Sequence, residues 1–242
     1  MITKSVVKDI QSLAGKKYRD QAGLFLAEGP KLVEELLRDC SHSIKAIYAL
    51  ESWIQQNKII NSSIQVTLVT PAELERLSQL ITPHEVLAVV SKFPISPLQI
   101  DKGLTLVCCG IQDPGNFGTI LRTADWFGVR QLVCSPDTVD VYNPKVVQAT
   151  MGSIARLAVH YMDLDPWLDE QEVPIYAAIL NGQSVYEINR SQSGILLIGN
   201  EAKGVPASLL TKKVTGITIP KIGEAESLNA AVATGILLSW LS

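Results

Sequence analysis

Three polar islands punctuate the second half of this 242-residue chain, and each of them follows a short apolar run. The islands lie at residues 113–122, 199–204 and 226–229, after apolar runs at 104–109, 195–198 and 217–219. Loops that follow parallel strands gather at one edge of an α/β sheet, where ligands bind. The order of the islands therefore predicts one site assembled from three distant segments.

Alternating apolar runs and helical patterns predict a parallel sheet covered by helices on both faces. Two further apolar runs lie at 131–134 and 175–180. A helix that ends near Gly128 is predicted from the helical spacing of Phe117, Ile120, Leu121, Ala124 and Phe127. The fold class predicted for this half is α/β.

The first 94 residues have the pattern of a second, smaller α/β domain. Helices are predicted at 29–39 and 71–80, and strands at 44–50, 64–69 and 86–90. Pro94, Ser96, Pro97 and Gly103 then interrupt the pattern. We therefore predict a domain at 1–94, a linker at 95–103 and a second domain at 104–242.

Composition indicates a globular protein, since 47% of the residues are hydrophobic and 19% are charged. The N-terminus lacks the continuous apolar run of a targeting segment. The uncharged run at 227–242 is shorter than the roughly 20 apolar residues of a membrane span. These features predict a soluble, cytoplasmic protein that makes no use of a membrane.

Cysteine and histidine positions argue against a metal enzyme. The four cysteines, Cys40, Cys108, Cys109 and Cys134, form no CxxC pair and are predicted to be buried core thiols. The histidines are scattered without metal-like spacing. Neither a GxGxxG fingerprint nor a P-loop occurs, which argues against a nucleotide-dependent oxidoreductase.

Each island also has a purely structural interpretation. Asn116 could be only a helix cap, and Arg122 could pair with Asp125 three residues on. Glu201 could be a solvated turn residue, and Ser227 an N-cap with Asn229 in the first turn. The basic patch at 16–19 could be a solvated loop, whereas its clustered charge could also bind phosphates in spite of the net charge of −3.

The islands together resemble the three ordered motifs of the SpoU (TrmH-like) RNA ribose methyltransferases. The matching segments are DPGNFGTILRTADWFGV, LLIGNEAKGV and IPKIGEAESLNAAVATGILL, and the resemblance runs from about residue 104 to the end. The segment KDIQSLAGKKYRDQAGLFLAEGPKLVEELL resembles, more loosely, the ribosomal-protein-like substrate-binding domain of many members.

The resemblance implies S-adenosylmethionine as methyl donor, a ribose 2′-hydroxyl as acceptor, a deep trefoil knot and a homodimer. It maps catalytic roles onto Asn116, Arg122, Glu201, Ser227 and Asn229. It maps cofactor binding onto Leu180, Gly199, Gly204, Ile219 and Leu228. RNA binding is expected at Lys16, Lys17, Arg19, Arg122 and Lys145, and no metal is expected. An arginine with a pKa above about 12 is a poor base, so we expect Arg122 to clamp a phosphate and polarise the hydroxyl.

The N-terminal resemblance favours ribosomal RNA, specifically 23S RNA, over tRNA as the substrate. A tRNA 2′-O-methyltransferase and a thiostrepton-resistance-like methylase share the same motifs and stay open. A third alternative is an RNA-binding ribosome-assembly factor that has lost catalysis, although the five intact motif residues argue against it.

Overall fold

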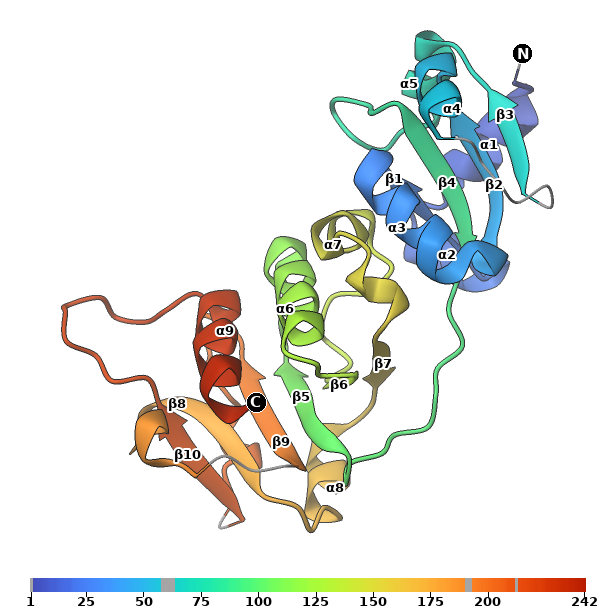
Figure 1. Cartoon of the computed structure of the whole chain (residues 1–242). Helices are drawn as coiled ribbons and strands as arrows, with labels where there is room; N and C mark the ends of the chain where they lie inside the picture. Colours follow the sequence, from blue (N-terminus) through green and yellow to red (C-terminus); the bar gives the residue numbers. More distant parts are fainter. Residues whose placement is uncertain (1, 58–63, 190–192, 212) are drawn as a thin grey trace. The chain divides into compact units, whose positions relative to one another are not determined.

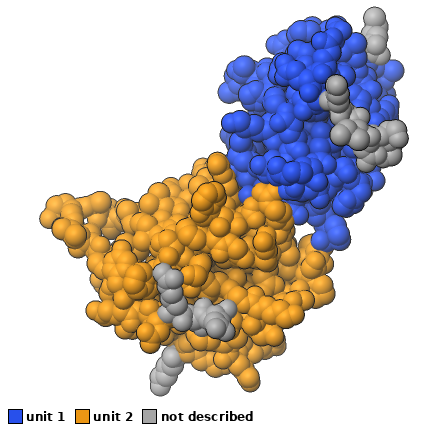
Figure 2. All heavy atoms as spheres, viewed as in Figure 1, with its two compact units in different colours: residues 1–94, 140–155 blue, residues 95–139, 156–242 orange. Residues whose placement is uncertain are grey.

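The computed structural model describes residues 2–57, 64–189, 193–211 and 213–242 (Figure 1). The chain divides into two compact units (Figure 2). Unit 1 comprises residues 1–94 and 140–155, and unit 2 comprises residues 95–139 and 156–242. Both units combine helices with a β-sheet, which confirms the α/β class.

Unit 1 contains a four-stranded mixed sheet in the order β1-β4-β2-β3. Its strands are β1 (Leu24–Glu28), β2 (Ile44–Ala49), β3 (Gln65–Leu68) and β4 (Val86–Ser91). Its helices are α1 (Lys4–Ser12), α2 (Lys16–Ala22), α3 (Pro30–Cys40), α4 (Glu51–Gln56), α5 (Pro71–Leu77) and α7 (Pro144–Thr150), with 3-10 turns η1 (Ser41–Ser43) and η2 (Ser153–Ala155). The predicted strands and helices are confirmed here, whereas α1, α2, α4, α7 and β1 were not predicted.

The segment 140–155 lies within the predicted C-terminal domain but packs with unit 1. The ring of Tyr142 lies 4.9 Å from the ring of Phe25, and its hydroxyl accepts a 3.0 Å hydrogen bond from the Phe93 amide. Helix α7 packs against β1. The two compact units therefore differ from the domains predicted at 1–94 and 104–242, because residues 140–155 belong to unit 1. Those domain boundaries stay a prediction.

Arg19 binds this segment from within unit 1. Its side chain is only 2% exposed, and its guanidinium forms an ion pair with Asp140 at 2.6 Å. The guanidinium also donates to the carbonyl oxygens of Leu13 and Ala14 at 2.9 and 2.7 Å. The predicted RNA contact of Arg19 does not fit this placement, because a buried and paired guanidinium offers nothing to an RNA phosphate. Its role is to join two segments of unit 1.

Unit 2 contains a six-stranded sheet in the order β10-β8-β9-β5-β6-β7, with every neighbouring pair parallel. Its strands are β5 (Gly103–Cys109), β6 (Gln131–Cys134), β7 (Ala158–Tyr161), β8 (Ile175–Ser184), β9 (Ser193–Gly199) and β10 (Val214–Thr218). Its helices are α6 (Pro114–Trp126), α8 (Leu164–Asp169) and α9 (Ala230–Leu241), with 3-10 turns η3 (Val185–Glu187) and η4 (Ala207–Leu209). The predicted parallel sheet is confirmed, and β7 is an edge strand that was not predicted.

The strands at the centre of unit 2 are buried along almost their whole length, as expected for a sheet covered on both faces. Cys108 and Cys109 of β5 and Cys134 of β6 are buried and free, and Cys40 is likewise buried in unit 1, which confirms the prediction of core thiols. Burial raises the pKa of the Cys109 thiol well above its usual range, so the thiol form is strongly favoured. No helix in the described ranges has the length and apolar character that crossing a membrane requires.

Candidate active site

The first island forms the start of α6, with Asp113 as its N-cap. The Asp113 carboxylate accepts a 2.7 Å hydrogen bond from the Asn116 amide nitrogen. The interpretation of Asn116 as the N-cap is therefore wrong, because the Asp113 carboxylate, three residues earlier, already accepts from the backbone N–H of Asn116. The side chain of Asn116 is left available for contacts outside its own helix.

The third island ends at Asn229, which caps α9. Its side-chain oxygen accepts hydrogen bonds from the amides of Ala231 and Val232 at 3.0 and 3.3 Å. Ser227 was expected to be this cap, but it lies two residues before Asn229 on the wall of a cavity. Asparagine and serine cap helices about equally well, so the sequence alone did not distinguish them.

A chain of side-chain hydrogen bonds joins the three islands. Asn116 Nδ2 donates to Glu201 Oε1 at 2.5 Å, and Asn229 Nδ2 donates to Asn116 Oδ1 at 2.9 Å. The residues come from the segments after β5, after β9 and before α9, which lie up to 113 positions apart in the sequence. The convergence expected from the order of the islands is present for these three residues.

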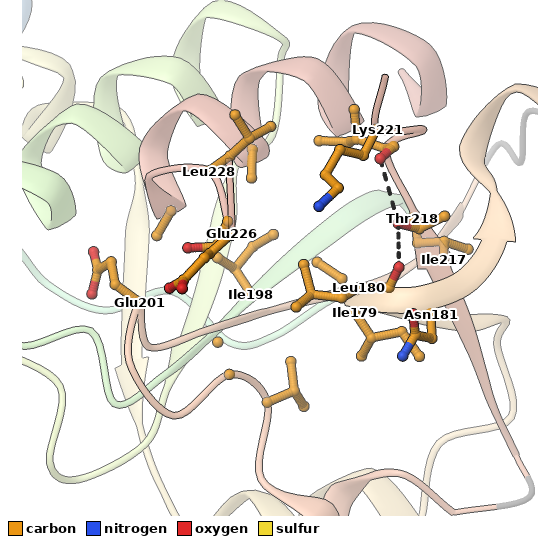
Figure 3. A pocket seen from close by; sticks show the side chains of 18 of the residues that line it. Ile179, Leu180, Asn181, Ile198, Glu201, Ile217, Thr218, Lys221, Glu226 and Leu228 are labelled. Atoms are coloured by element: carbon orange, nitrogen blue, oxygen red, sulfur yellow. Dashed lines mark hydrogen bonds between the residues drawn. The ribbon is translucent and has the colours of Figure 1, made fainter. Parts of the chain in front are cut away.

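A cavity of about 720 Å³ opens beside Glu201 (Figure 3). Its wall includes all five residues to which the resemblance assigned cofactor binding, Leu180, Gly199, Gly204, Ile219 and Leu228, together with Glu201 and Ser227. Glu201 and Glu226 lie on one side of the cavity, and Leu180 and Thr218 lie on the other (Figure 3). The volume falls within the usual range of small-molecule sites, about 300–1,000 Å³.

Several lining residues were missed from the sequence. They include Asn181, Ile198, Ile217, Thr218 and Lys221. Each lies within a few positions of a residue that was predicted, at the end of a strand or in the loop that follows it. Extending the predicted islands by a few residues on each side would have found them.

The loop after β9 is held in a tight conformation by its glycines. A Cβ on Gly199 would lie 2.1 Å from the carbonyl carbon of Gly204 and 2.2 Å from the nitrogen of Val205. Gly204 has a φ of +69°, in the left-handed region. Asn200 Nδ2 donates to the Gly110 carbonyl at 2.9 Å and anchors the loop to the end of β5. The loop can thus present backbone groups to the cavity in one fixed arrangement.

Strand β8 departs from its ladder beside the cavity. Gly216 of β10 pairs with Ala177, but the next residue, Ile217, pairs with Gln183. Residues 178–182 are therefore bulged out of the register with β10, and residues 178–181 line the cavity. Thr218 Oγ1 donates to the Leu180 carbonyl at 3.0 Å and fixes the bulge. Bulges re-aim backbone and side chains near active sites, and this one faces the cavity wall.

Arg122 is not brought to the other four catalytic candidates. It lies on the exposed side of α6, and six residues at 3.6 per turn place it about 240° around the helix from Asn116. No hydrogen bond or ion pair joins its side chain to another described residue. The interpretation that it pairs with Asp125 is wrong, because Asp125 binds Arg130 at 3.5 Å and Arg156 at 2.8 Å. Arg122 therefore projects a cation toward solvent.

The other predicted RNA-binding residues lie in unit 1. Lys17 and Lys145 are exposed on α2 and α7, and Lys16 is exposed but paired with Asp20 at 2.8 Å. Lys92 also donates to Asp20. These two lysine contacts, that of Lys16 first, lower the pKa of Asp20 to about 2. The predicted loop at 16–19 is instead the helix α2.

No cluster of three or more metal-ligating side chains is found within the described ranges. The cavity wall combines apolar side chains, bulged and glycine-rich backbone, the carboxylates of Glu201 and Glu226, and the lysines Lys203 and Lys221. Apolar side chains enclose a flat heterocycle, and side chains of both signs pair with opposite charges on a ligand. These residues fit an organic ligand that carries a ring and charges of both signs, which is the chemistry of S-adenosylmethionine.

Comparison with known proteins agrees with this geometry. Residues 103–239 match the SpoU rRNA Methylase family, and residues 4–88 match the MRM3-like substrate binding domain. The chain is 34% identical to the 23S rRNA (guanosine(2553)-2′-O)-methyltransferase RlmP of Bacillus subtilis, over 97% of this chain and 95% of that protein.

Two solved structures superpose on the whole chain. A protein from Porphyromonas gingivalis, assigned to the TrmH family of RNA methyltransferases, has a TM-score of 0.88 and 35% identity, with coverage of 100% of this chain and 98% of that one. An AdoMet-bound rRNA methyltransferase from Sinorhizobium meliloti has a TM-score of 0.84 and 30% identity, with coverage of 100% and 95%. The motifs, the cavity that they surround and these matches together establish that the chain belongs to the SpoU rRNA methylase family.

Proposed function

We propose that this protein methylates a ribose 2′-hydroxyl of ribosomal RNA, with S-adenosylmethionine as the methyl donor. The observation that carries the proposal is the hydrogen-bonded chain from Glu201 through Asn116 to Asn229 at the edge of the cavity. Family membership and the rRNA enzymes among the relatives support it. Ribosomal RNA as substrate is consistent with the cytoplasmic location expected from the sequence.

The cavity residues have complementary roles in this proposal. Leu180, Ile219 and Leu228 would enclose the apolar part of S-adenosylmethionine, and the backbone around Gly199 would provide fixed hydrogen-bonding groups. Glu201 would attract positive charge. Bound S-adenosylmethionine supplies an activated methyl group, so the protein needs to position a nucleophile and stabilise its developing charge.

Asn116 would position the nucleotide relative to the other motifs. Its amide donates to Glu201 and accepts from Asn229, so neither end can rotate without breaking a hydrogen bond. A side chain locked in this way costs little reorganisation when a substrate binds. Ser227, on the same cavity wall, would contribute a hydroxyl that can donate or accept.

Arg122 would clamp the RNA phosphate and polarise the 2′-hydroxyl in the site of a partner subunit. Two observations support this assignment. Arg122 is exposed and has no hydrogen-bond or ion-pair partner among the residues that the structure describes. Trp126, one turn further along α6, is 83% exposed. Val232 of the neighbouring helix α9 is 50% exposed. Apolar side chains exposed on two packed helices favour association, so we propose a homodimer formed through this face.

We also propose the deep trefoil knot that the resemblance implies for unit 2. One close backbone approach between segments distant in the sequence supports it: a Cβ on Gly182 of β8 would lie 2.6 Å from the carbonyl carbon of Gly216 of β10. Backbones that approach so closely require positions without side chains.

The methylation reaction is tested with S-adenosylmethionine carrying a labelled methyl group and an unmodified 23S rRNA transcript. Label is expected in the transcript, at one ribose that becomes unmodified in cells from which the gene is deleted. Labelling of bulk tRNA with an unlabelled rRNA transcript would replace the proposed substrate. Absence of transfer to either RNA, with the cofactor bound, would contradict the proposed activity.

The role of Arg122 is tested by mixing two inactive variants, Arg122→Ala and Glu201→Ala, so that heterodimers form. If Arg122 acts in the partner's site, one site of each heterodimer has both substitutions and the other has neither, so activity returns. If Arg122 acts in its own subunit, both sites stay impaired. Near-normal turnover of the folded Arg122→Ala protein would reject the assignment altogether.

A further inference from the structure

A group of polar side chains from three distant segments surrounds Gly29 in unit 1. A Cβ on Gly29 would lie 3.2 Å from the His84 ring and 3.7 Å from Gln148 Nε2. Gly29 is the N-cap of α3, His84 lies in the loop before β4, and Gln148 lies on α7. With a φ of +99°, position 29 favours glycine, and its bare Cα leaves the backbone open to a neighbour.

Two lysines extend this group on both sides. Lys145 lies three residues before Gln148 on α7, so the two side chains share a face, while Val146 and Val147 are buried. Lys31 is exposed in the first turn of α3, two residues after Gly29. We call Gly29, Lys31, His84, Lys145 and Gln148 the Gly29 surface.

The polar side chains of the Gly29 surface have no hydrogen-bond or ion-pair partner among the residues that the structure describes. Three cations elsewhere in unit 1 are paired within it, namely Lys16 and Lys92 with Asp20 and Arg19 with Asp140. Lys8 and Lys45 are exposed like Lys31 and Lys145, but the two lysines of the Gly29 surface lie within three residues of Gly29 and Gln148, where side chains from three segments meet.

Two acidic residues next to the Gly29 surface in sequence, Glu28 and Glu85, are engaged elsewhere, whereas Glu34 is exposed three residues after Lys31 on α3. Glu28 is 5% exposed and accepts hydrogen bonds from the Ser78 hydroxyl and the Gln79 amide. Glu85 accepts a hydrogen bond from the Ser52 hydroxyl at 2.9 Å. The negative charges next to Gly29 and His84 in the chain are therefore held by partners within unit 1.

We propose that the Gly29 surface binds the RNA substrate, with Lys31 and Lys145 on phosphates and His84 and Gln148 on an adjacent nucleotide. This inference rests on the proposed function and deepens it. Lysine ammonium groups neutralise phosphates, an imidazole ring stacks on an unpaired base, and an amide both donates to and accepts from base edges. An RNA strand presents all three kinds of partner within a few ångströms, and RNA is the substrate of the proposed function.

The composition of the surface has a structural consequence. Lys145 and Gln148 belong to the region that matches the SpoU methylase family, residues 103–239, yet they pack with unit 1. The region that matches the substrate binding domain, residues 4–88, supplies only Gly29, Lys31 and His84. The RNA-binding surface of unit 1 is thus completed by a helix from the methylase region.

The test measures binding of an unmodified 23S rRNA transcript by the full-length protein over a range of KCl concentrations. Lys31→Ala/Lys145→Ala is compared with Lys8→Ala/Lys45→Ala, a matched pair of exposed lysines elsewhere in unit 1. Loss of two phosphate contacts is expected to reduce the slope of log K against log salt by about 1.4–1.8, and the control slope is expected to stay unchanged.

His84→Ala and Gln148→Ala are expected to weaken binding about fivefold or more without changing the salt slope, since they remove nucleotide contacts and no cation. Calorimetric affinity for S-adenosylmethionine, whose cavity lies in unit 2, is expected to match wild type in every variant and verifies folding. Wild-type affinity and slope in the variants, with the wild-type protein still binding and methylating RNA, would overturn this inference alone. A wild-type protein that binds no rRNA would instead contradict the proposed function.

Discussion

Gly199→Ala offers a direct test of how the cofactor loop is built. The new methyl carbon would lie 2.1 Å from the Gly204 carbonyl carbon, whereas ordinary contacts begin at 3.4 Å. The two backbone segments must therefore separate by up to about 1.3 Å, the difference between those distances, because neither contact is with a flexible side chain. Overpacking of this kind costs about 1–3 kcal/mol.

Moving this loop also affects binding, because the same loop lines the cavity and carries Glu201. If the strain is relieved by displacing the loop, the hydrogen bond from Asn200 to Gly110 is lost as well, at about 0.5–1.5 kcal/mol. Since about 1.4 kcal/mol is a factor of ten, we expect the dissociation constant for S-adenosylmethionine to rise about tenfold or more. The melting temperature should fall by several degrees, about 2–4 °C for each kcal/mol in a chain of this size.

Isothermal titration with S-adenosylmethionine and thermal unfolding measure the two effects. Gly235→Ala is the matched control, because its Cβ would meet only the Thr123 methyl group at 3.6 Å, an ordinary contact, and alanine favours a helix. Gly199→Ala with wild-type affinity and an unchanged melting temperature would refute the view that the close approach of Gly199 to Gly204 shapes the cavity. A lower melting temperature with wild-type affinity for S-adenosylmethionine would indicate that Gly199 matters for folding only.

Three further results are expected. Asn116→Ala removes a hydrogen bond to the Glu201 carboxylate that is worth about 1.5–3 kcal/mol, so turnover should fall about tenfold or more. Calorimetry should show nearly unchanged affinity for the cofactor. Unaltered turnover would contradict the positioning role of Asn116. Arg19→Met leaves the partly buried Asp140 carboxylate without its ion pair and should destabilise unit 1 by up to about 3 kcal/mol, measured by hydrogen exchange. Exposed Lys17→Met should have little effect, and equal losses would count against the pair. The pKa of Asp20 in the folded state is about 2, below its ordinary value of 3.8. Its contribution to the free energy of unfolding is therefore present above pH 3.8 and is lost as the pH falls through about 2. In an acid titration of stability, Asp20→Asn should lose less free energy of unfolding than wild type, and identical profiles would exclude this linkage.

The sequence predicted best where one physical pattern dominated. Apolar runs at 104–109, 131–134 and 195–198 indicated buried parallel strands, because strands covered on both faces have no polar side to interrupt the run. The short edge strand Ala158–Tyr161 was missed, since its alternation of small, polar and apolar residues is too brief to be distinctive. Helices α1 and α2 were not predicted, because the many polar residues on their exposed faces are also typical of solvated loops.

The residues that cap the helices were predicted less well than the meeting of the three polar islands at one site. Asn116 and Ser227 both had the right residue type and setting for an N-cap, but Asp113 and Asn229 occupy those positions. Several neighbouring residues can cap a helix about equally well, and the choice depends on where the chain enters the helix. That choice has a functional consequence, because it leaves the amide of Asn116 free to bind Glu201.

By itself, the sequence determined the α/β class, the buried parallel strands, the three polar islands and, through their order, the family to which the chain belongs. Tertiary structure decided which side chains meet: Glu201 with Asn116 and Asn229, but not Arg122, and Arg19 with Asp140 instead of RNA. Periodicity reports only which face of an element is buried, and it contains no information about partners 85 or 121 positions away. Those partners are fixed when the sheet of unit 2 brings its strand ends to one edge, and when residues 140–155 pack against unit 1.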